Sequence, residues 1–214
     1  MNMKILGLIA GAAILLGAQS AYAVSITNGS FESGLANVGA FTALSGGDTT
    51  SITGWTVGGA GGVDYIGTYW TASDGARSLD LSGGGIGGVS QQLTGLTIGQ
   101  EYTVSFDLAG NPAGGPTVKN LAVSTTGGAE LFTFDTSGKN TGNMGWTTFT
   151  YVFIATAADD ILAFLSTTGG SGGPALDNIT IAATPIPGAI LLFGSALGGM
   201  GFLGYRRRKL EAAA

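Results

Sequence analysis

The stretch YTVSFDLAG, residues 102–110, alternates between apolar and polar side chains. One side of the extended chain carries Tyr102, Val104, Phe106 and Leu108. The threonine, serine and aspartate between them point to the other side. This two-residue period predicts a β-strand that packs one face against a core.

Similar short runs fill residues 24–184, where clusters of Gly, Asn, Asp, Ser and Pro separate them and no helical period is sustained. Further strands are expected near 24–27, 54–57, 63–67, 78–81, 88–93, 119–125, 130–136, 146–156, 160–168 and 176–183. About ten short strands with Gly-rich turns indicate an all-β jelly-roll sandwich. The run at 146–156 is apolar on both faces, so we expect it in the centre of the sandwich.

The composition excludes several kinds of chemistry. The chain has no Cys and no His, which excludes disulfides, thiol catalysis, His-ligated metals and a Ser-His-Asp triad. Residues 24–184 carry twelve Asp and Glu against Arg77, Lys119 and Lys139, a net charge of −9 that makes a poor ligand for nucleic acid. Both lysines lie beside turn residues, so we expect them to be exposed.

No catalytic or nucleotide-binding motif stands out. Glycoside hydrolysis requires two carboxylates that flank one bond, and nothing in the sequence selects such a pair among the twelve. We therefore predict that the protein is not an enzyme and has no catalytic residues. Residues 83–88, GGGIGG, satisfy G-x-G-x-x-G, but no helix is expected to follow them. We interpret them as a flexible loop between strands.

Residues 1–23 are typical of a secretory signal peptide. Lys4 precedes an apolar run at 5–17, and Ala21-Tyr22-Ala23 forms a small-x-small cleavage site. We expect signal peptidase to release a mature chain that starts at Val24 outside the cytoplasmic membrane.

Residues 185–209 end the chain with a second apolar segment. The stretch 188–205 has no charge and as a helix would extend ~27 Å, just enough to cross a bilayer core. Glycines dilute its hydrophobicity, so it would be a weak permanent anchor. The basic cluster 206–209 should keep the C-terminus in the cytoplasm.

Several segments of the middle region occur in an order that resembles a known family. They include ITNGSFESG (26–34), ITGWTVGG (52–59), VDYIGTYW (63–70), DGARSLDLSG (74–83) and GPALDNITI (173–181). Together they resemble the choice-of-anchor C family and the related DUF642-type, galactose-binding-like proteins. The resemblance implies a galactose-binding-like jelly roll over 24–184.

The resemblance also implies a structural calcium ion. In related jelly-roll carbohydrate-binding modules, acids of the opening NGxFE segment and the closing LDN strand hold calcium with backbone carbonyls, and the matching residues are Glu32 and Asp177. Two acids with several carbonyls suit an ion that prefers hard oxygen ligands. The alternative is that Asp177 bonds to backbone amides or to Arg77.

The tail resembles the PEP-CTERM sorting signal of Gram-negative bacteria. Its features are Pro185 and Pro187, the apolar span, and the cluster of Arg206, Arg207, Arg208 and Lys209. Ile186 replaces the glutamate of the Pro-Glu-Pro motif. The resemblance implies processing by an exosortase in the inner membrane, and a plain membrane anchor is the alternative.

One cluster is a candidate ligand site. Tyr65, Tyr69 and Trp70 fall within six residues and are followed by Asp74 and Arg77. Sugars are commonly held by an aromatic ring with nearby groups that bond the hydroxyls, and an Arg can stack on a ring. Tyr69 and Trp70 alternate, so only one can face the core. The alternative role of Arg77 is a structural ion pair.

These observations predict a secreted, exosortase-sorted protein of the cell surface or extracellular matrix, held transiently in the inner membrane. We expect it to bind or organise extracellular polysaccharide in biofilm or floc. A purely structural matrix protein without a glycan ligand, and an enzyme that acts on envelope polymers, are the alternatives.

Overall fold

The computed structural model describes residues 24–185, which form eleven strands and no helix. The strands are β1 (Phe41–Leu44), β2 (Thr56–Gly58), β3 (Val63–Ile66), β4 (Ser78–Asp80), β5 (Gly88–Leu93), β6 (Glu101–Gly110), β7 (Val118–Thr125), β8 (Gly128–Asp135), β9 (Thr147–Ile154), β10 (Asp160–Ser166) and β11 (Pro174–Ala183). They build an all-β jelly-roll sandwich, as the alternation of side chains predicts.

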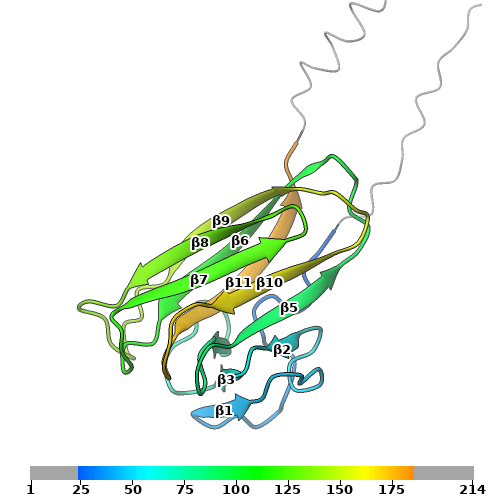
Figure 1. The fold of residues 1–214 in the computed structure, drawn as a ribbon. Helices are drawn as coiled ribbons and strands as arrows, with labels where there is room; N and C mark the ends of the chain where they lie inside the picture. Colours follow the sequence, from blue (N-terminus) through cyan, green and yellow to red (C-terminus); the bar gives the residue numbers. More distant parts are fainter. Residues whose placement is uncertain (1–23, 186–214) are drawn as a thin grey trace, which may run out of the picture.

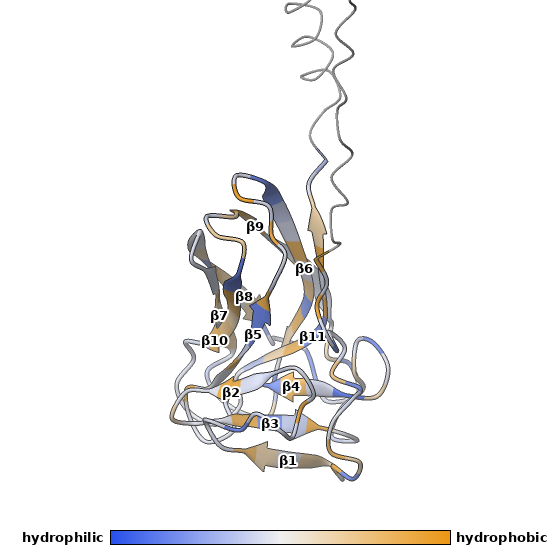
Figure 2. Ribbon diagram, turned by 90° about the vertical axis from the view of Figure 1, so that its right-hand side faces the viewer, coloured by the Kyte–Doolittle hydropathy of each residue, from blue (hydrophilic) through white to orange (hydrophobic). Residues whose placement is uncertain are grey.

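Two antiparallel sheets pack face to face (Figures 1 and 2). The six-stranded sheet has the order β1-β3-β4-β11-β6-β9, and the five-stranded sheet has the order β2-β5-β10-β7-β8. Residues 24 and 185 lie at the same end of the sandwich, and the loop between β8 and β9 lies at the far end (Figure 1).

Phe106 of β6 occupies the centre of the core. Its ring makes edge contacts with Phe132 of β8 at 5.1 Å and Phe164 of β10 at 5.4 Å between centroids, so it joins the two sheets. Trp55 extends this aromatic cluster through Phe164 and Phe31. Each fully buried ring contributes on the order of 1.5–3 kcal/mol by leaving water.

The predicted strands are confirmed except near residues 24–27, where no strand forms, and β1 was not predicted. The position of β9 is also a correction. Its apolar character on both faces predicted a central strand, but β9 is the outermost strand of the six-stranded sheet.

The glycine run at 83–88 connects β4 to β5, as predicted, and its backbone makes close contacts. Its backbone bonds to the loop at 59–62, with Gly61 N donating to the Ile86 carbonyl at 2.9 Å and Gly84 N to the Gly61 carbonyl at 2.9 Å. A Cβ at Gly87 would lie 1.7 Å from the Gly62 carbonyl oxygen. Two backbones approach so closely here that glycine is required.

Lys119 is fully buried, so the expectation that it is exposed is wrong. Its Nζ donates to the carbonyl of Gly114 at 2.5 Å and to that of Gly172 at 2.8 Å. Burial lowers the pKa of Lys119, and the nearby Asp80 carboxylate opposes this shift. The side chain thus ties the β6–β7 loop to the β10–β11 loop.

The predicted terminal segments lie outside the described residues, apart from the exposed Pro185. Residues 1–23, Pro187, the span 188–205 and the basic cluster 206–209 remain predictions. The part of the chain that is described has no helix able to cross a bilayer.

Candidate functional site

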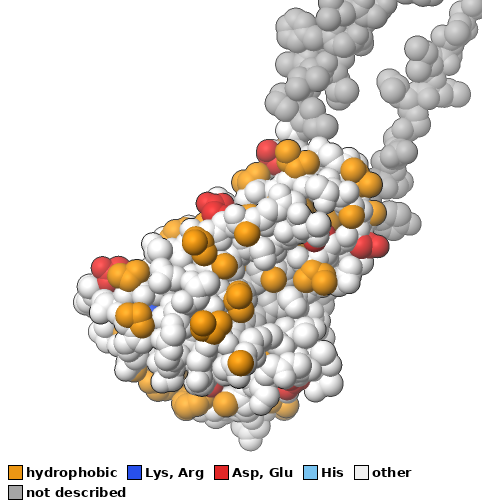
Figure 3. All heavy atoms as spheres, viewed as in Figure 1, with side chains coloured by type: hydrophobic (Ala, Val, Ile, Leu, Met, Phe, Trp, Pro, Cys, Tyr) orange, Lys and Arg blue, Asp and Glu red, His pale blue; other side chains and the backbone are white. Residues whose placement is uncertain are grey.

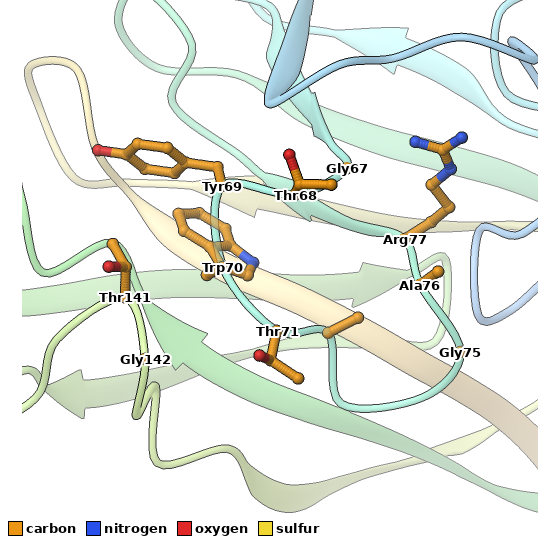
Figure 4. A pocket seen from close by; sticks show the side chains of 11 residues that line it. Gly67, Thr68, Tyr69, Trp70, Thr71, Gly75, Ala76, Arg77, Thr141 and Gly142 are labelled. Carbon is orange, nitrogen blue, oxygen red and sulfur yellow. The ribbon is translucent and has the colours of Figure 1, made fainter.

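An open pocket of about 580 Å³ lies where the β3–β4 loop meets the β8–β9 loop (Figure 4). Its lining residues are Gly67, Thr68, Tyr69, Trp70, Thr71, Ala72, Gly75, Ala76 and Arg77 from the first loop and Thr141 and Gly142 from the second. Three of the five residues in the predicted ligand cluster therefore line it, namely Tyr69, Trp70 and Arg77.

The two adjacent aromatic residues divide as their alternation predicts. Trp70 is buried, and its indole N–H donates to Ser78 Oγ at 2.8 Å. Tyr69 is only partly buried, and its ring lies 5.4 Å from that of Trp70 and 5.6 Å from that of Phe41. The ring of Tyr69 extends along one side of the pocket (Figure 4), where it offers an aromatic surface to a ligand.

Tyr65 is not part of this surface, which corrects its assignment to the ligand site. It is 0% exposed, and its hydroxyl donates to the carbonyl of Phe31. Burial raises the pKa of this hydroxyl, while the Arg77 charge lowers it and Glu32 raises it. Its contribution is indirect, because the Arg77 guanidinium carbon lies 5.7 Å from the centroid of its ring.

Arg77 lies at the opposite side of the pocket from Tyr69 (Figure 4). Its guanidinium donates to the carbonyl of Ala36 at 3.4 Å, a long hydrogen bond. The side chain is partly exposed and is supported by the Tyr65 ring. A guanidinium has five N–H donors, so Arg77 retains donors that can bond to a ligand.

Asp74 does not line the pocket, although the sequence grouped it with the ligand residues. Its carboxylate accepts a hydrogen bond from Ser30 Oγ at 2.6 Å and so connects the β3–β4 loop to the N-terminal segment. Its role in the described structure is to position this loop.

Two acids, Asp177 and Glu32, hold the β3–β4 loop in place. Asp177 Oδ2 accepts the backbone N–H groups of Ser73 at 2.8 Å and Asp74 at 2.9 Å. Glu32 Oε1 accepts those of Ala76 at 2.8 Å and Arg77 at 2.7 Å. The exposed Glu32 and the fully buried Asp177 therefore fix neighbouring segments in the second half of this loop.

These contacts do not fit the calcium site implied for Glu32 and Asp177. Both residues reach the same loop, but their oxygens are aimed at N–H donors, whose positive ends would repel a cation. Asp177 Oδ1 is also used, because it accepts the N–H of Asn178 at 2.7 Å. No group of three acids, histidines or cysteines within residues 24–185 could hold a metal ion. The geometry matches the alternative, a carboxylate bonded to backbone amides.

Asp177 and Asp107, two acids that accept hydrogen bonds from the loop, have pKa values shifted in opposite directions. Burial raises the pKa of Asp177 to about 7, even though its three backbone N–H donors favour the ionised form. Asp107 lies directly across from it on β6. Burial also raises the pKa of Asp107, but hydrogen bonds from Ser73, Thr148 and Asn178 outweigh burial and hold it below the usual range.

The sequence did not indicate the other wall of the pocket. Thr141 and Gly142 come from a loop that is about 70 residues from Tyr69 in the chain, and nothing in their local pattern marks them. Trp146 joins the two loops, because its indole N–H donates to the Thr71 carbonyl at 3.0 Å. Only the folded arrangement brings the three threonines of the pocket together: Thr68, Thr71 and Thr141.

Residues 24–182 match a family model whose description is "Protein of unknown function (DUF642)". The chain belongs to the DUF642 family. The match includes every strand of the sandwich except the last residue of β11, and it includes both loops that form the pocket.

One curated relative of this DUF642 protein is Halomucin from Haloquadratum walsbyi, which is 32% identical over 142 residues. The aligned region takes 65% of this chain but only 2% of Halomucin. The DUF642 chain thus corresponds to a very small part of that relative.

Solved structures similar to the DUF642 domain include several carbohydrate-binding modules. A CBM4 structure aligns with a TM-score of 0.42 and 19% identity over 74% of this chain and 99% of the module. The CBM22-1 xylan-binding domain of Paenibacillus barcinonensis Xyn10C aligns with a TM-score of 0.45 and 19% identity, over 67% of this chain and 99% of that domain. TmCBM61, in complex with β-1,4-galactotriose, aligns with a TM-score of 0.44 and 16% identity, over 61% of this chain and 88% of the module.

Proposed function

We propose that this DUF642 protein is a non-enzymatic protein of the cell surface or extracellular matrix and that it binds extracellular polysaccharide through the pocket between the β3–β4 and β8–β9 loops. A sugar ring would lie against Tyr69, with its hydroxyls bonded by the threonines and by Arg77. In biofilm or floc, such binding would organise the matrix.

The observation that carries this proposal is the chemistry of the pocket wall. One side has the partly exposed ring of Tyr69, the opposite side has the guanidinium of Arg77, and hydroxyl side chains lie between them. An apolar ring face with surrounding donors and acceptors suits a sugar, which has apolar C–H faces and a rim of hydroxyls.

The loop that forms the pocket is also held before any ligand arrives. Backbone N–H groups at four of its positions bond to carboxylates, and Gly67 and Tyr69 donate to the carbonyl of Ala40. A preformed site reduces the conformational entropy lost on binding.

The test is binding of the purified protein to an array of bacterial and plant polysaccharides. We expect Tyr69→Ala and Arg77→Gln each to weaken binding by about tenfold, the equivalent of ~1.4 kcal/mol for one lost contact. Trp70 is a poorer probe, because it is buried and its removal would leave a cavity in the core.

Ile161→Ala is the matched control, because Ile161 is exposed on the other sheet away from the pocket. Binding that survives both pocket substitutions would refute this pocket as the site. Release of shortened glycans would instead favour the enzyme alternative.

We also propose that signal peptidase removes residues 1–23 and that an exosortase processes the tail beginning at Pro185. The sequence patterns of the two ends support this proposal. The β8–β9 wall of the pocket lies at the end of the sandwich away from residue 185 (Figure 1). A ligand could therefore reach it while the tail is still in the inner membrane.

A further inference from the structure

The two sheets have four edge strands: β1 and β9 in one, β2 and β8 in the other. An open edge can pair with a strand of another chain, and native proteins prevent this with short strands, charges, prolines or bulges. Here β1 has four residues and β2 has three, while β8 has eight residues but carries Glu130 and Asp135. Three of the four edges therefore carry a recognised form of protection.

The fourth edge, β9, has none of these devices. It has eight residues, TTFTYVFI, without a charge, a proline or a glycine. Its pairing with β6 runs in continuous register from Thr147 to Ile154, with no bulge. Among residues 24–185 no other strand pairs with it, so its outer row of backbone N–H and C=O groups is unpaired by the sheet.

The side chains of β9 also indicate an unprotected edge. Val152 is 48% exposed and Ile154 is 55% exposed on the outer face of the sheet. Their neighbours across β6 are Thr103 and Glu101, so the apolar groups gather at the edge rather than over the middle of the sheet. Because these outward residues are apolar as well as the buried ones, the sequence of β9 resembles that of a strand covered on both faces.

We propose that β9 pairs in antiparallel fashion with β9 of a second copy of this chain, which would join the two six-stranded sheets into one. A two-fold axis normal to the sheet keeps outward side chains on the same face. It can place Val152 of one copy opposite Thr150 of the other, and Ile154 opposite Thr148. This inference does not depend on glycan binding.

The side-chain pattern of β9 favours a second copy as the occupant, and charge limits where that copy can bind. Residues 24–184 carry a net charge of −9, so two such domains repel each other over most of their surfaces. The uncharged β9 lets two copies approach where this repulsion is weakest, and its alternating threonine and aliphatic side chains are complementary to themselves under a two-fold axis.

The outer face of the five-stranded sheet is the competing surface. Leu131 of β8 and Ile161 and Leu165 of β10 are exposed. Figure 3 shows this face of the molecule, where apolar patches are separated by largely uncharged surface. Association through this face would be blocked by changes at Ile161 and not by changes at β9, so one pair of variants distinguishes the two surfaces.

The first test is sedimentation of the full chain in detergent micelles over a range of concentrations. We expect a dimer whose dissociation constant rises by about tenfold or more in Val152→Lys, because the charges of two copies would meet across the paired strands. Ile161→Lys should leave the dimer unchanged. Thermal unfolding of each variant confirms that it is folded. A monomeric wild type, or a dimer that persists in Val152→Lys, overturns the proposal.

The second test uses the absence of cysteine from the chain. A mixture of Thr150→Cys and Val152→Cys variants should form a disulfide-linked dimer on mild oxidation, because directly opposite strand residues are close enough for this bond. A mixture of Leu131→Cys and Val152→Cys is the control and should cross-link far less. Equal cross-linking of both mixtures, or capture of another protein's strand by a β9 that forms no homodimer, would overturn pairing between copies.

Discussion

Asp64, on β3 of the six-stranded sheet, has a carboxylate oxygen without a hydrogen-bond partner. It lies directly opposite Asp80 across β3 and β4, and its Oδ1 is buried without a hydrogen-bond partner. Burial, with the Asp80 charge as a second cause, raises the pKa of Asp64 to about 6. Asp80 differs, because its carboxylate accepts hydrogen bonds from Ser82, Asn111 and Gly173. Asp64 is therefore the acid of this pair that is more easily replaced.

We predict that Asp64→Asn raises the melting temperature by a few degrees at pH 8 and changes it little at pH 4. The folded pKa of about 6 is above the unfolded value of ~3.9. The stability linked to this proton is thus present below about pH 4 and is lost as the pH rises through 6. Asparagine carries no charge, so the variant avoids the loss.

Thermal unfolding at the two pH values checks this prediction. Asp159→Asn is the control, because Asp159 is exposed. Asp177, whose folded pKa of about 7 is also raised, should make the wild type less stable at pH 8 than at pH 5. A shift of equal size at both pH values in Asp64→Asn would contradict the prediction.

The β3–β4 loop is the element that connects the fold to the proposed function. Its conformation depends on acceptors from three distant segments: Glu32 near the N-terminus, Asp107 on β6 and Asp177 on β11. Each backbone N–H bonded to a carboxylate contributes on the order of 1.5–3 kcal/mol when buried, and less where the acid is exposed. A loop held in this way needs no metal ion to be ordered.

We predict that a chelator leaves the melting temperature unchanged and that added calcium does not raise it. The reason is that the oxygens of Glu32 and Asp177 that face the loop are occupied by N–H donors. Differential scanning fluorimetry with EDTA and with calcium measures this. A rise in the melting temperature that saturates with calcium would restore the site implied by the family resemblance.

At the scale of the elements, the sequence predicted where strands lie in the chain better than their order in the sheets. Alternation located ten of the eleven strands, because burial of one face imposes a two-residue period. It missed β1, which has four residues, of which only Leu44 is buried. It misplaced β9 because an apolar pattern shows that a face is covered but not which element covers it.

On the scale of the whole molecule, the ends of the described chain lie apart from the β8–β9 wall of the pocket. The described part ends at residue 185, at the same end of the sandwich as residue 24, and the β8–β9 loop of the pocket lies at the other end (Figure 1). Under the proposed function, a protein anchored at one end and binding polysaccharide at the other would connect a surface to the material around it.

We predict that the mature protein isolated from its own host begins at Val24 and lacks the basic cluster of Arg206, Arg207, Arg208 and Lys209. Both follow from the processing signals at the two ends of the sequence. Intact-mass spectrometry measures both ends at once. Retention of the basic cluster in a host that has an exosortase would instead support a permanent membrane anchor.

The sequence by itself determined the all-β sandwich and the exclusion of cysteine and histidine chemistry, and it predicts the two terminal signals. These properties depend on local patterns or on composition, which a linear chain displays directly. It also grouped Tyr69, Trp70 and Arg77, which line one pocket, because they are close in the chain and lie in one loop.

Only the tertiary structure decided what those residues do. It buried Tyr65 beneath Arg77, brought Thr141 to the pocket, turned the acids Glu32 and Asp177 toward backbone N–H groups, and left β9 at an open edge. Each of these outcomes depends on contacts between segments that are far apart in the chain. The order in which strands pair, and not the local pattern of a strand, determines which segments meet.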